Sequence, residues 1–525
     1  MAMARRDRLS STILVMLMLT SVFVALVGPA SPVAASNETT SGTITGTEYW
    51  QGNHVLTGDV VISSGAKLVI QPSTNVVFPN GTHLDARGSL CIGVSSCGAS
   101  GNANSAQRIT FSWEEPENSS AQGECNGISQ GQFEITITDP SCYEGLIIRD
   151  SIDLSQSGIR HTTLDGAWGI PHFVDNQNGF KYAALVLDGA SPTLTEMEFI
   201  DINSSSVLTT GLAQPEFIGG QYIVGNDDES GVDGPAVQIY SSGTPITPLI
   251  MSSPDLVGSD NGCGNNAGGK PTVWVEDAFI EIDDAEIGVG DYGISLRYSS
   301  GSVTNSDISV NCNGIDIYSL KSVGQVDYYN TITGNEIVTG DRTPITVYGG
   351  AHAFIRDNDL SGAGSGSGIA VFSSYAEITN NEIGPIGGWN GLWMYGSFDV
   401  IAENNTIFDT NREAIIAGEY RETPSAARAF LANNTISSSG SGTCESDIHF
   451  ASPGNPDGEF PCPAVMAYRS GLTMYDNEIN AGGTTDGIRS IGALLDIRRN
   501  TWNAAGSGAV IKHYDSGYAG DQQYG

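Results

Sequence analysis

Four aromatic residues recur at matching points of a repeated motif in the second half of the chain. Tyr318, Tyr348, Phe372 and Tyr395 each end a short run in which apolar and polar residues alternate, and Trp393 lies just before the last of them. Flat rings cover the apolar faces of sugars and a tyrosine hydroxyl adds a polar contact, so an exposed row of such rings would suit a polysaccharide. The alternative is that the rings stack on one another, which is worth about 0.5–1.5 kcal/mol per pair.

Few residues in the same runs have types suited to catalysis. In two further repeats, the position of the aromatic residue is taken by Arg297 and Ala417. Asp316 lies two residues before Tyr318. Elimination chemistry on polysaccharides needs carboxylates with a nearby arginine or lysine, and the candidates are Arg297, Asp316 and Lys512, with Arg489 as a further basic group. We place Arg297 and Asp316 in adjacent repeats but at different outward positions, where an ion pair is the expected outcome. The seven histidines show no spacing typical of a metal site.

The element that must position these residues is a repeat of about 23 residues. Its mark is an asparagine followed two residues later by an apolar residue, with intervals of 23, 23, 24, 29, 43 and 23 residues. A period of this size indicates a solenoid, because each unit buries its apolar face only by stacking on its neighbours. The asparagines are Asn335, Asn358, Asn381, Asn405, Asn434, Asn477 and Asn500.

One repeat, which begins at Gly368, contains three short alternating runs and no segment long enough for a helix. Alternation at period two indicates strands, so each repeat should form one coil of a three-sided parallel β-helix, an all-β fold. Asparagine tolerates the positive φ of a sharp bend, and stacked asparagines can hydrogen-bond as a ladder along the axis. Upstream of Asn335, the same strand pattern continues, but other residues take the place of the turn asparagine: Ser306, Ala285, Met197 and Thr162. A β-sandwich is the alternative.

These motifs resemble the pectate-lyase-like right-handed parallel β-helix superfamily, in particular the repeat group that includes the periplasmic copper-binding β-helix proteins. The resemblance covers about residues 50–515 and rests on the asparagine turn and the glycine-led first strand. It implies that a substrate would lie across the outward face of the first strand, which here carries the aromatic row. The segments N-T-D, G-H-G and R-I-K of related hydrolases are missing, and only bare acidic pairs appear, Asp227-Asp228 and Asp283-Asp284.

The chain is expected to comprise a leader and one domain. Residues 1–35 combine a basic start with an apolar run over 13–27 and a small-residue cleavage pattern, which is typical of a signal peptide, with an uncleaved anchor as the alternative. Residues 36–525 form a single β-helix domain, with loop insertions near 93–142, 203–272 and 437–463. The last run starts a new coil near Ala509 and contains no turn asparagine. We expect either a cap built from these residues or, in preference, a chain truncated at its C-terminus.

Cysteine usage points to an oxidising compartment. The eight cysteines fall as neighbouring pairs, and an even number in an exported chain favours disulfides, although the pairing stays open. Six N-x-S/T sequons, at Asn37, Asn80, Asn118, Asn203, Asn404 and Asn433, are compatible with a glycoprotein. The cysteine pairs are Cys91 with Cys97, Cys125 with Cys142, Cys263 with Cys312, and Cys444 with Cys462.

The formal charge of −37 excludes nucleic acid as a partner, because phosphates would be repelled. The many carboxylates make calcium a possible cofactor. However, the loop richest in acidic residues, 225–234, lacks the regular ligand spacing of a calcium-binding loop. Simple solvation of an acidic surface is the alternative.

Three functional hypotheses remain. The first is a secreted or cell-surface protein, without a membrane span in the mature chain, that binds polysaccharide or cell-envelope glycans through the first-strand face without catalysis. The second is a polysaccharide lyase or glycoside hydrolase. The third is a structural stalk of a larger surface protein. An exposed aromatic row would favour glycan binding over a structural stalk, because a stalk does not need one. Convergent carboxylates with an arginine or lysine would favour an enzyme over a non-catalytic binding protein. The oligomeric state stays open.

Overall fold

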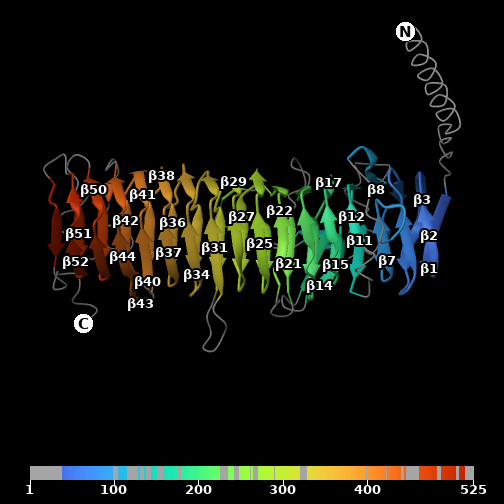
Figure 1. Ribbon diagram of the computed structural model, residues 1–525, viewed down its shortest axis with the longest axis horizontal. Coiled ribbons are helices and arrows are strands. Elements are labelled where there is room, and N and C mark those ends of the chain that lie inside the picture. The colour runs from blue at the N-terminus through green and yellow to red at the C-terminus, as the bar shows by residue number, and fades with distance from the viewer. Residues whose placement is uncertain are drawn as a thin grey trace, which may run out of the picture.

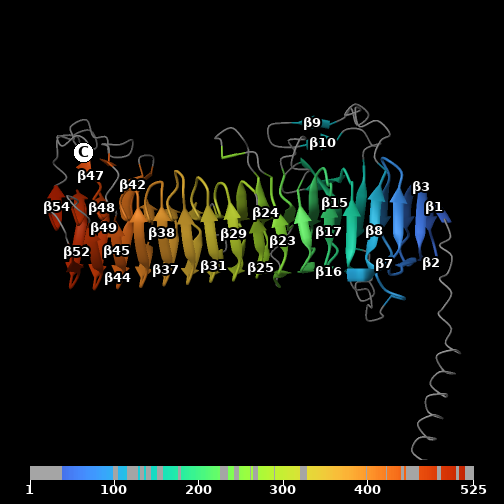
Figure 2. The ribbon, with the colours of Figure 1, turned by 90° about the horizontal axis from the view of Figure 1, so that it is seen from above.

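The computed structural model describes residues 38–97, 105–114, 128–130, 135–137, 143–150, 158–174, 179–224, 234–241, 247–259, 262–263, 270–288, 290–319, 328–397, 399–420, 423–438, 443–444, 460–481, 486–503 and 508–514. Short strands stack side by side into a rod that runs from the first coils to the last (Figures 1 and 2). The predicted signal peptide, Asp227 and Asp228 lie outside the described residues.

One coil shows how the rod is built. β36 (Ile369–Phe372), β37 (Tyr375–Thr379) and β38 (Glu382–Ile386) follow one another around the axis, and β39 (Leu392–Tyr395) then pairs in parallel with β36, Ile369 opposite Leu392. β37 pairs with the corresponding strands of the neighbouring coils, as does β38. The pairing thus forms three stacks of strands, here called the first, second and third faces, and the predicted three-sided parallel β-helix is confirmed.

The first face continues from the C-terminal halves of β1 (Glu38–Ile44) and β3 (Asn53–Ile62). Its other strands are β6 (His83–Ala86), β11 (Gly145–Arg149), β15 (Gly179–Asp188), β18 (Ser205–Thr210), β21 (Val237–Tyr240), β24 (Pro271–Glu276), β27 (Tyr292–Arg297), β30 (Ile315–Tyr318), β33 (Ile345–Tyr348), β36, β39, β42 (Ile415–Tyr420), β48 (Val465–Tyr468), β51 (Ile488–Ile491) and β54 (Ile511–Tyr514).

The second face is a sheet of 16 strands. They are β2 (Thr47–Trp50), β4 (Lys67–Ile70), β7 (Ser89–Ile92), β12 (Gly158–Arg160), β16 (Thr193–Thr195), β19 (Glu216–Ile218), β22 (Leu249–Ser252), β25 (Phe279–Asp283), β28 (Ser300–Thr304), β31 (Tyr329–Thr333), β34 (His352–Arg356), β37, β40 (Asp399–Glu403), β44 (Arg428–Ala432), β49 (Gly471–Tyr475) and β52 (Leu494–Arg498).

The third face begins with the N-terminal halves of β1 and β3. Its other strands are β5 (Asn75–Phe78), β8 (Ile109–Trp113), β13 (Thr162–Asp165), β17 (Glu198–Ile200), β20 (Gln221–Ile223), β23 (Asp255–Val257), β26 (Glu286–Gly288), β29 (Asp307–Val310), β32 (Glu336–Thr339), β35 (Asp359–Gly362), β38, β41 (Thr406–Thr410), β45 (Thr435–Ser438), β50 (Glu478–Ala481) and β53 (Thr501–Trp502).

A single apolar core fills the interior along the axis, from Ile44 to Ala493. Alternate residues of every face point inward, as Ile369, Val371 and Ile378 do in the coil of β36, and these side chains are fully buried. Because each coil contacts only its neighbours, stability is expected to be a sum of coil and interface contributions. Within the described ranges, no helix reaches the length and hydrophobicity that crossing a bilayer requires.

The asparagines of the repeat line the turn between the second and third faces. Each side-chain amide donates to the Oδ1 of the asparagine in the next coil, at 2.9–3.0 Å from Asn335 to Asn500. The same Nδ2 also donates to a backbone carbonyl of a preceding coil, as Asn381 does to Ile355 at 2.9 Å. Ser306 extends this row by donating its backbone N–H to Asn335 Oδ1 at 2.9 Å.

The positive φ of this turn lies one residue earlier than the sequence suggested. Asn380 and Asn404 have φ of 58°, and Asp357 has 56°, whereas the buried asparagines that follow them are not in the left-handed region. The repeat therefore separates two tasks: an exposed residue makes the bend, and the next residue turns its amide inward. A β-branched residue would be strained at the first position.

The segment 203–272 was expected to be a loop insertion, and this is wrong for the residues of it that the structure describes. It contains β18 to β23, which belong to the three faces and continue the coils. The sequence concealed these coils because Gly220 and Pro254 take the turn position of asparagine, although Tyr222 and Leu256 keep the buried apolar position. Within the segment near 93–142, β9 (Ile128–Gln130) and β10 (Ile135–Ile137) pair outside the rod, above β15 in Figure 2, whereas β8 follows the 3-10 turn η1 (Ser105–Gln107) as a third-face strand.

Two of the predicted disulfides are confirmed. Cys91 bonds to Cys97, and Cys263 bonds to Cys312 across 49 residues. Cys462 is also disulfide-bonded. The side chains of Cys125, Cys142 and Cys444 lie outside the described residues, so their pairing stays a prediction. β46 (Thr443–Cys444) and β47 (Phe460–Pro461) form a small antiparallel pair within the excursion near 437–463.

A buried carboxylate joins the turns at the N-terminal end of the first face. Glu144 Oε1 accepts the Gly81 N–H at 2.8 Å, and Oε2 accepts the Trp168 N–H at 3.2 Å. Burial raises the pKa of Glu144 to about 7, because the two backbone donors only partly compensate for lost water.

This pKa predicts a pH dependence of stability. Between about pH 4.5 and 7 the folded state keeps a proton on Glu144 that the unfolded state has released, so the free energy of unfolding should fall as pH rises through this window, by about 2–3 kcal/mol. Denaturant titrations at pH 4.5 and 7.5 measure it. The Glu144→Gln variant, which cannot titrate, should show a smaller fall, and an equal fall would contradict the assignment.

Carboxylates form a continuous column on the outside of the third face. They are register partners in successive coils: Asp255, Glu286, Asp307, Glu336, Asp359 and Glu382. Neighbouring coils lie about 4.8 Å apart, and like charges directly opposite each other destabilise a sheet. Glu336→Gln should therefore raise the melting temperature by about one degree at 20 mM salt. The gain should vanish at 1 M NaCl, where charges are screened, and an equal gain at both salt concentrations would contradict this explanation.

Candidate functional site

The predicted aromatic row exists on the outside of the first face. Tyr318, Tyr348, Phe372 and Tyr395 are register partners on β30, β33, β36 and β39, and Arg297 on β27 precedes them. These four aromatic residues are called the aromatic column. Its expected continuation at Ala417 is wrong, and Gly418 takes that position while Ala417 is buried in the core. The frame was one residue off because Ala414, and not Glu413, replaces the opening glycine of β42.

The rings of the aromatic column are not equally available. Tyr318 and Tyr348 are half-buried, with ring centroids 4.7 Å apart. Tyr395 is 1% exposed and packs against Phe372 and Trp393 at 6.5 and 5.6 Å. The expectation that Tyr395 offers its ring to a ligand is therefore wrong, because its side chain is almost fully buried.

A second group of rings meets the column at an angle. Trp393 lies 4.9 Å from Phe372 with the planes at 81°, and 5.2 Å from Trp389 with the planes at 68°. Trp389 is 37% exposed and lies in the loop that leads from β38 to β39. We call Phe372, Trp389 and Trp393 the aromatic corner. Trp389 was missed in the sequence because it lies outside the strand pattern, and its only signal is the Trp at position i+4.

Arg297 and Asp316 are brought to the same end of the aromatic column. The Arg297 guanidinium lies 4.3 Å from the ring centroid of Trp274 and 5.6 Å from that of Tyr318, and its Nε donates weakly to Ser295 at 3.5 Å. Cation–π contacts of this kind hold the charge over the rings. The expected ion pair with Asp316 does not form within these described residues. Lys512 lies on β54 at the far end of the first face, so the three catalytic candidates do not share one site.

The carboxyl of Asp316 titrates close to neutrality. Burial raises its pKa to about 6, although hydrogen bonds from Asn313 and Thr346 and the charge of Arg297 act in the opposite direction. Asn313 Nδ2 donates to Asp316 Oδ1 at 3.0 Å. Burial, followed by the nearby Asp316 charge, also raises the pKa of Tyr348 to about 12, so its phenol stays protonated as a hydrogen-bond donor.

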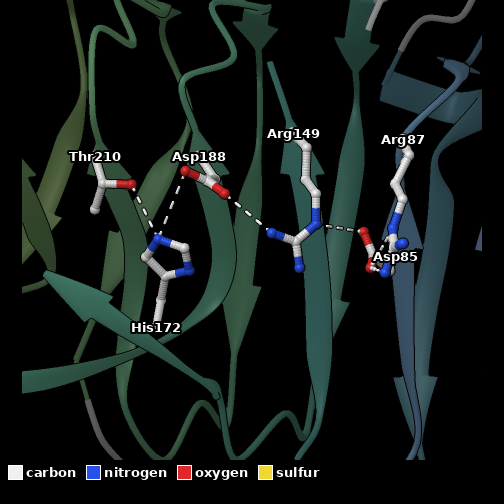
Figure 3. A network of polar contacts seen from close by, with 6 residues as sticks. All are labelled: Asp85, Arg87, Arg149, His172, Asp188 and Thr210. Atoms are coloured by element: carbon white, nitrogen blue, oxygen red, sulfur yellow. Dashed lines mark hydrogen bonds and ion pairs between the residues drawn. The ribbon is translucent and has the colours of Figure 1, made fainter. Parts of the chain in front are cut away.

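A charged network occupies the first face nearer the N-terminus (Figure 3). Arg149 donates from Nε to Asp85 Oδ1 at 2.9 Å and from Nη1 to Asp188 Oδ2 at 3.0 Å, and Arg87 binds the other oxygen of Asp85 at 2.7 Å. Arg149 and Asp188 are register partners on adjacent coils, in the same outward position as the aromatic column further along. The two arginines balance the charges of Asp85 and Asp188, so these carboxylates do not need an external cation.

A hairpin closes over this part of the face. β14 (Ile170–Val174) pairs antiparallel with β15, and its His172 places Nε2 at 3.3 Å from Thr210 Oγ1 and 3.6 Å from Asp188 Oδ1. Ile170 and Val174 of the hairpin pack on outward apolar side chains, Ile147, Val186 and Leu208. The network and this small apolar cluster hold the hairpin against the rod, so the hairpin covers this part of the first face.

No three His, Cys, Asp or Glu side chains in the described ranges converge in a way that would hold a metal ion. Calcium therefore stays an expectation from composition alone.

Comparisons with known proteins concern the fold. Residues 292–447 match the family model described as a right handed beta helix region. No curated protein matches the chain. A double mutant of the periplasmic alginate epimerase AlgG is 12% identical over 87% of this chain and 78% of its own, with a TM-score of 0.32. Bacteriophage CBA120 tailspike protein 3 is 9% identical over 87% of this chain and 57% of its own, with a TM-score of 0.29. The surface adhesin PfbA of Streptococcus pneumoniae is 11% identical over 89% of this chain and 85% of its own, with a TM-score of 0.23.

Likenesses this distant do not transfer an activity. Together with the three parallel stacks, the family match identifies the fold of this chain as a right-handed parallel β-helix.

Proposed function

We propose that this protein works outside the cytoplasm and binds a polysaccharide along the first face, without cleaving it, at the aromatic corner and the adjoining Tyr318 and Tyr348. The observation that carries the proposal is the corner itself. Trp389 and Trp393 present rings at 68° to each other, and Trp389 keeps more than a third of its surface exposed although it neighbours a rod with a full apolar core. Rings arranged in this way can contact the face and the edge of one sugar.

The proposed compartment is supported by covalent chemistry. Disulfides persist in oxidising surroundings, and this chain has Cys91–Cys97 and Cys263–Cys312. We assign residues 1–35 the role of a signal peptide on sequence grounds. A stalk within a larger surface protein remains the third hypothesis, but a stalk does not require exposed tryptophans.

Catalysis is the second candidate, favoured by the pKa of about 6 at Asp316. A carboxyl that titrates near neutrality suits proton transfer. Glycoside hydrolysis, however, uses two carboxyl groups on either side of the scissile bond. Asp316 is the single carboxylate among the outward residues in the paired segments of β30, β33, β36, β39 and β42, and this favours binding over hydrolysis.

The test measures binding and turnover on the same polysaccharides. The disulfide-bonded chain is immobilised, soluble polysaccharides are passed over it with and without calcium, and each mixture is then assayed for new reducing ends and unsaturated products. We expect retention of at least one polymer, loss of retention in Trp393→Ala, and no new ends. If the wild type cleaves a polymer and Asp316→Asn abolishes the cleavage, the protein is an enzyme and the proposal of non-catalytic binding is wrong. If Trp393→Ala retains the polymer as the wild type does, the proposed binding site is wrong.

A further inference from the structure

The outward surface around the aromatic corner is poor in charge. In the paired segments of β30, β33, β36, β39 and β42, two residues of each strand point outward, and none of these is basic. Asp316 is the one acidic residue among them. A polymer with a carboxylate on every sugar would therefore lie along five strands without meeting a cation in these positions, and its charges would lose hydration without gaining ion pairs.

The basic groups at the edges of this surface already have partners. Arg297 is held over Trp274 and Tyr318. Arg342 donates from Nη2 to the Cys263 carbonyl oxygen at 2.5 Å. Arg412, next to the corner, lies 3.8 Å from the Glu413 carboxylate, which also accepts a hydrogen bond from Asn390 at 2.9 Å. Each of these guanidinium groups shares its charge with a group of the protein, so it offers less to a carboxylated or sulfated ligand than a solvated arginine would.

The charge of the whole chain acts in the same direction. At −37 it repels a polyanion over a distance of about one Debye length, which is about 8 Å at physiological salt. An uncharged ligand meets no such barrier. Its binding would depend on contact with the rings and on hydrogen bonds to hydroxyls such as those of Tyr318 and Tyr348.

From these observations we infer that the polysaccharide bound at the aromatic corner is uncharged, and that Trp389 is one of its contact residues. The inference rests on the proposed function and narrows it. Trp389 forms the outer wall of the corner, because it is the most exposed of the three rings and meets Trp393 nearly edge-on. Neighbouring coils lie about 4.8 Å apart, so an extended chain of sugars along the axis would place successive units over successive coils.

The experiment compares polymers of different charge on the full chain. A neutral glucan, a neutral mannan, polygalacturonate, alginate and a polymer of amino sugars are immobilised, and binding is measured by interferometry at 0.15 M NaCl with and without calcium. We expect binding to a neutral polymer that changes little between 0.05 and 0.5 M NaCl. Trp389→Ala should weaken it by about tenfold or more, as truncation of a central aromatic contact does.

Tyr49→Ala is the matched control, because Tyr49 is also an exposed ring, 52% accessible, but lies on the second face near the N-terminus. Stronger binding to an acidic or an amino-sugar polymer would overturn the assignment of an uncharged ligand while leaving glycan binding intact. Neutral binding that Trp389→Ala leaves unchanged would overturn the role of the corner. Absence of binding to all five polymers would overturn the proposed function and this inference together.

Discussion

Asn381→Ala should lower the free energy of unfolding by about 4 kcal/mol, since it leaves several buried hydrogen-bonding groups unpaired at about 1–3 kcal/mol each. Asn381 Nδ2 donates to the carbonyl of Ile355 at 2.9 Å and to Asn405 at 3.0 Å. Its Oδ1 accepts from the backbone and the side chain of Asn358 at 3.0 and 2.9 Å. Alanine removes all of these at a buried position, and the measurement is chemical denaturation followed by circular dichroism.

The adjacent residue provides the control. Asn380 is exposed and has a φ of 58°, which glycine adopts without strain, so Asn380→Gly should change stability by less than about 1 kcal/mol. Asn381→Asp adds a second check because a carboxylate accepts hydrogen bonds but cannot donate them. This variant should be more stable at pH 4 than at pH 8 relative to wild type. If Asn381→Ala and Asn380→Gly behaved alike, the ladder would contribute nothing beyond the turn.

Tyr395→Ala should destabilise the protein by about 3–5 kcal/mol, the cost of removing a large buried ring. The Tyr395 side chain is 1% exposed and packs against Phe372 and Trp393. Tyr395→Phe keeps the ring and should recover most of that loss. Thermal unfolding of the two variants gives the comparison.

Trp393→Ala distinguishes packing from binding at the same place. Because Trp393 is half-buried, we expect a smaller loss of stability than in Tyr395→Ala, together with the loss of polysaccharide retention. Tyr395→Phe should bind as wild type does. A Tyr395→Ala protein that melted like wild type would contradict the buried position of this ring.

The fold could be predicted from the sequence because its repeat is fixed by physical needs. An asparagine that hydrogen-bonds its amide in a buried row, followed by an inward apolar residue, recurs in successive coils from Asn335 to Asn500. The same logic failed where the turn has other residues. Gly220 and Pro254 stand where the other coils have the buried asparagine, so regular coils within 203–272 looked like a loop.

The site was only partly predictable. The aromatic column follows from register, which repeats with the period, and an error of one residue moved Ala417 into it in place of Gly418. The burial of Tyr395 could not be predicted from the sequence, because it depends on how this ring packs against Trp393 and Phe372. Trp389 lies in a loop between faces, and periodicity contains no information about loop conformation.

The charged network was hidden for a similar reason. Asp85, Arg149 and Asp188 belong to successive coils of the first face, but 63 residues separate Gly81 from Glu144 at the start of these coils. A repeat of about 23 residues cannot be recognised in the sequence across an interval of this length. His172 joins the network from a hairpin that no repeat contains.

The measurement that tests the account most directly is hydroxyl-radical footprinting of the chain with and without a saturating polysaccharide, read by mass spectrometry. We predict protection of Trp389, Trp393, Tyr318 and Tyr348 on the first face. Tyr329, which is 48% exposed on the second face, should keep its reactivity. Protection of Tyr329 with unchanged reactivity of Trp389 and Trp393 would contradict the account, because the glycan would then lie on a different side of the β-helix.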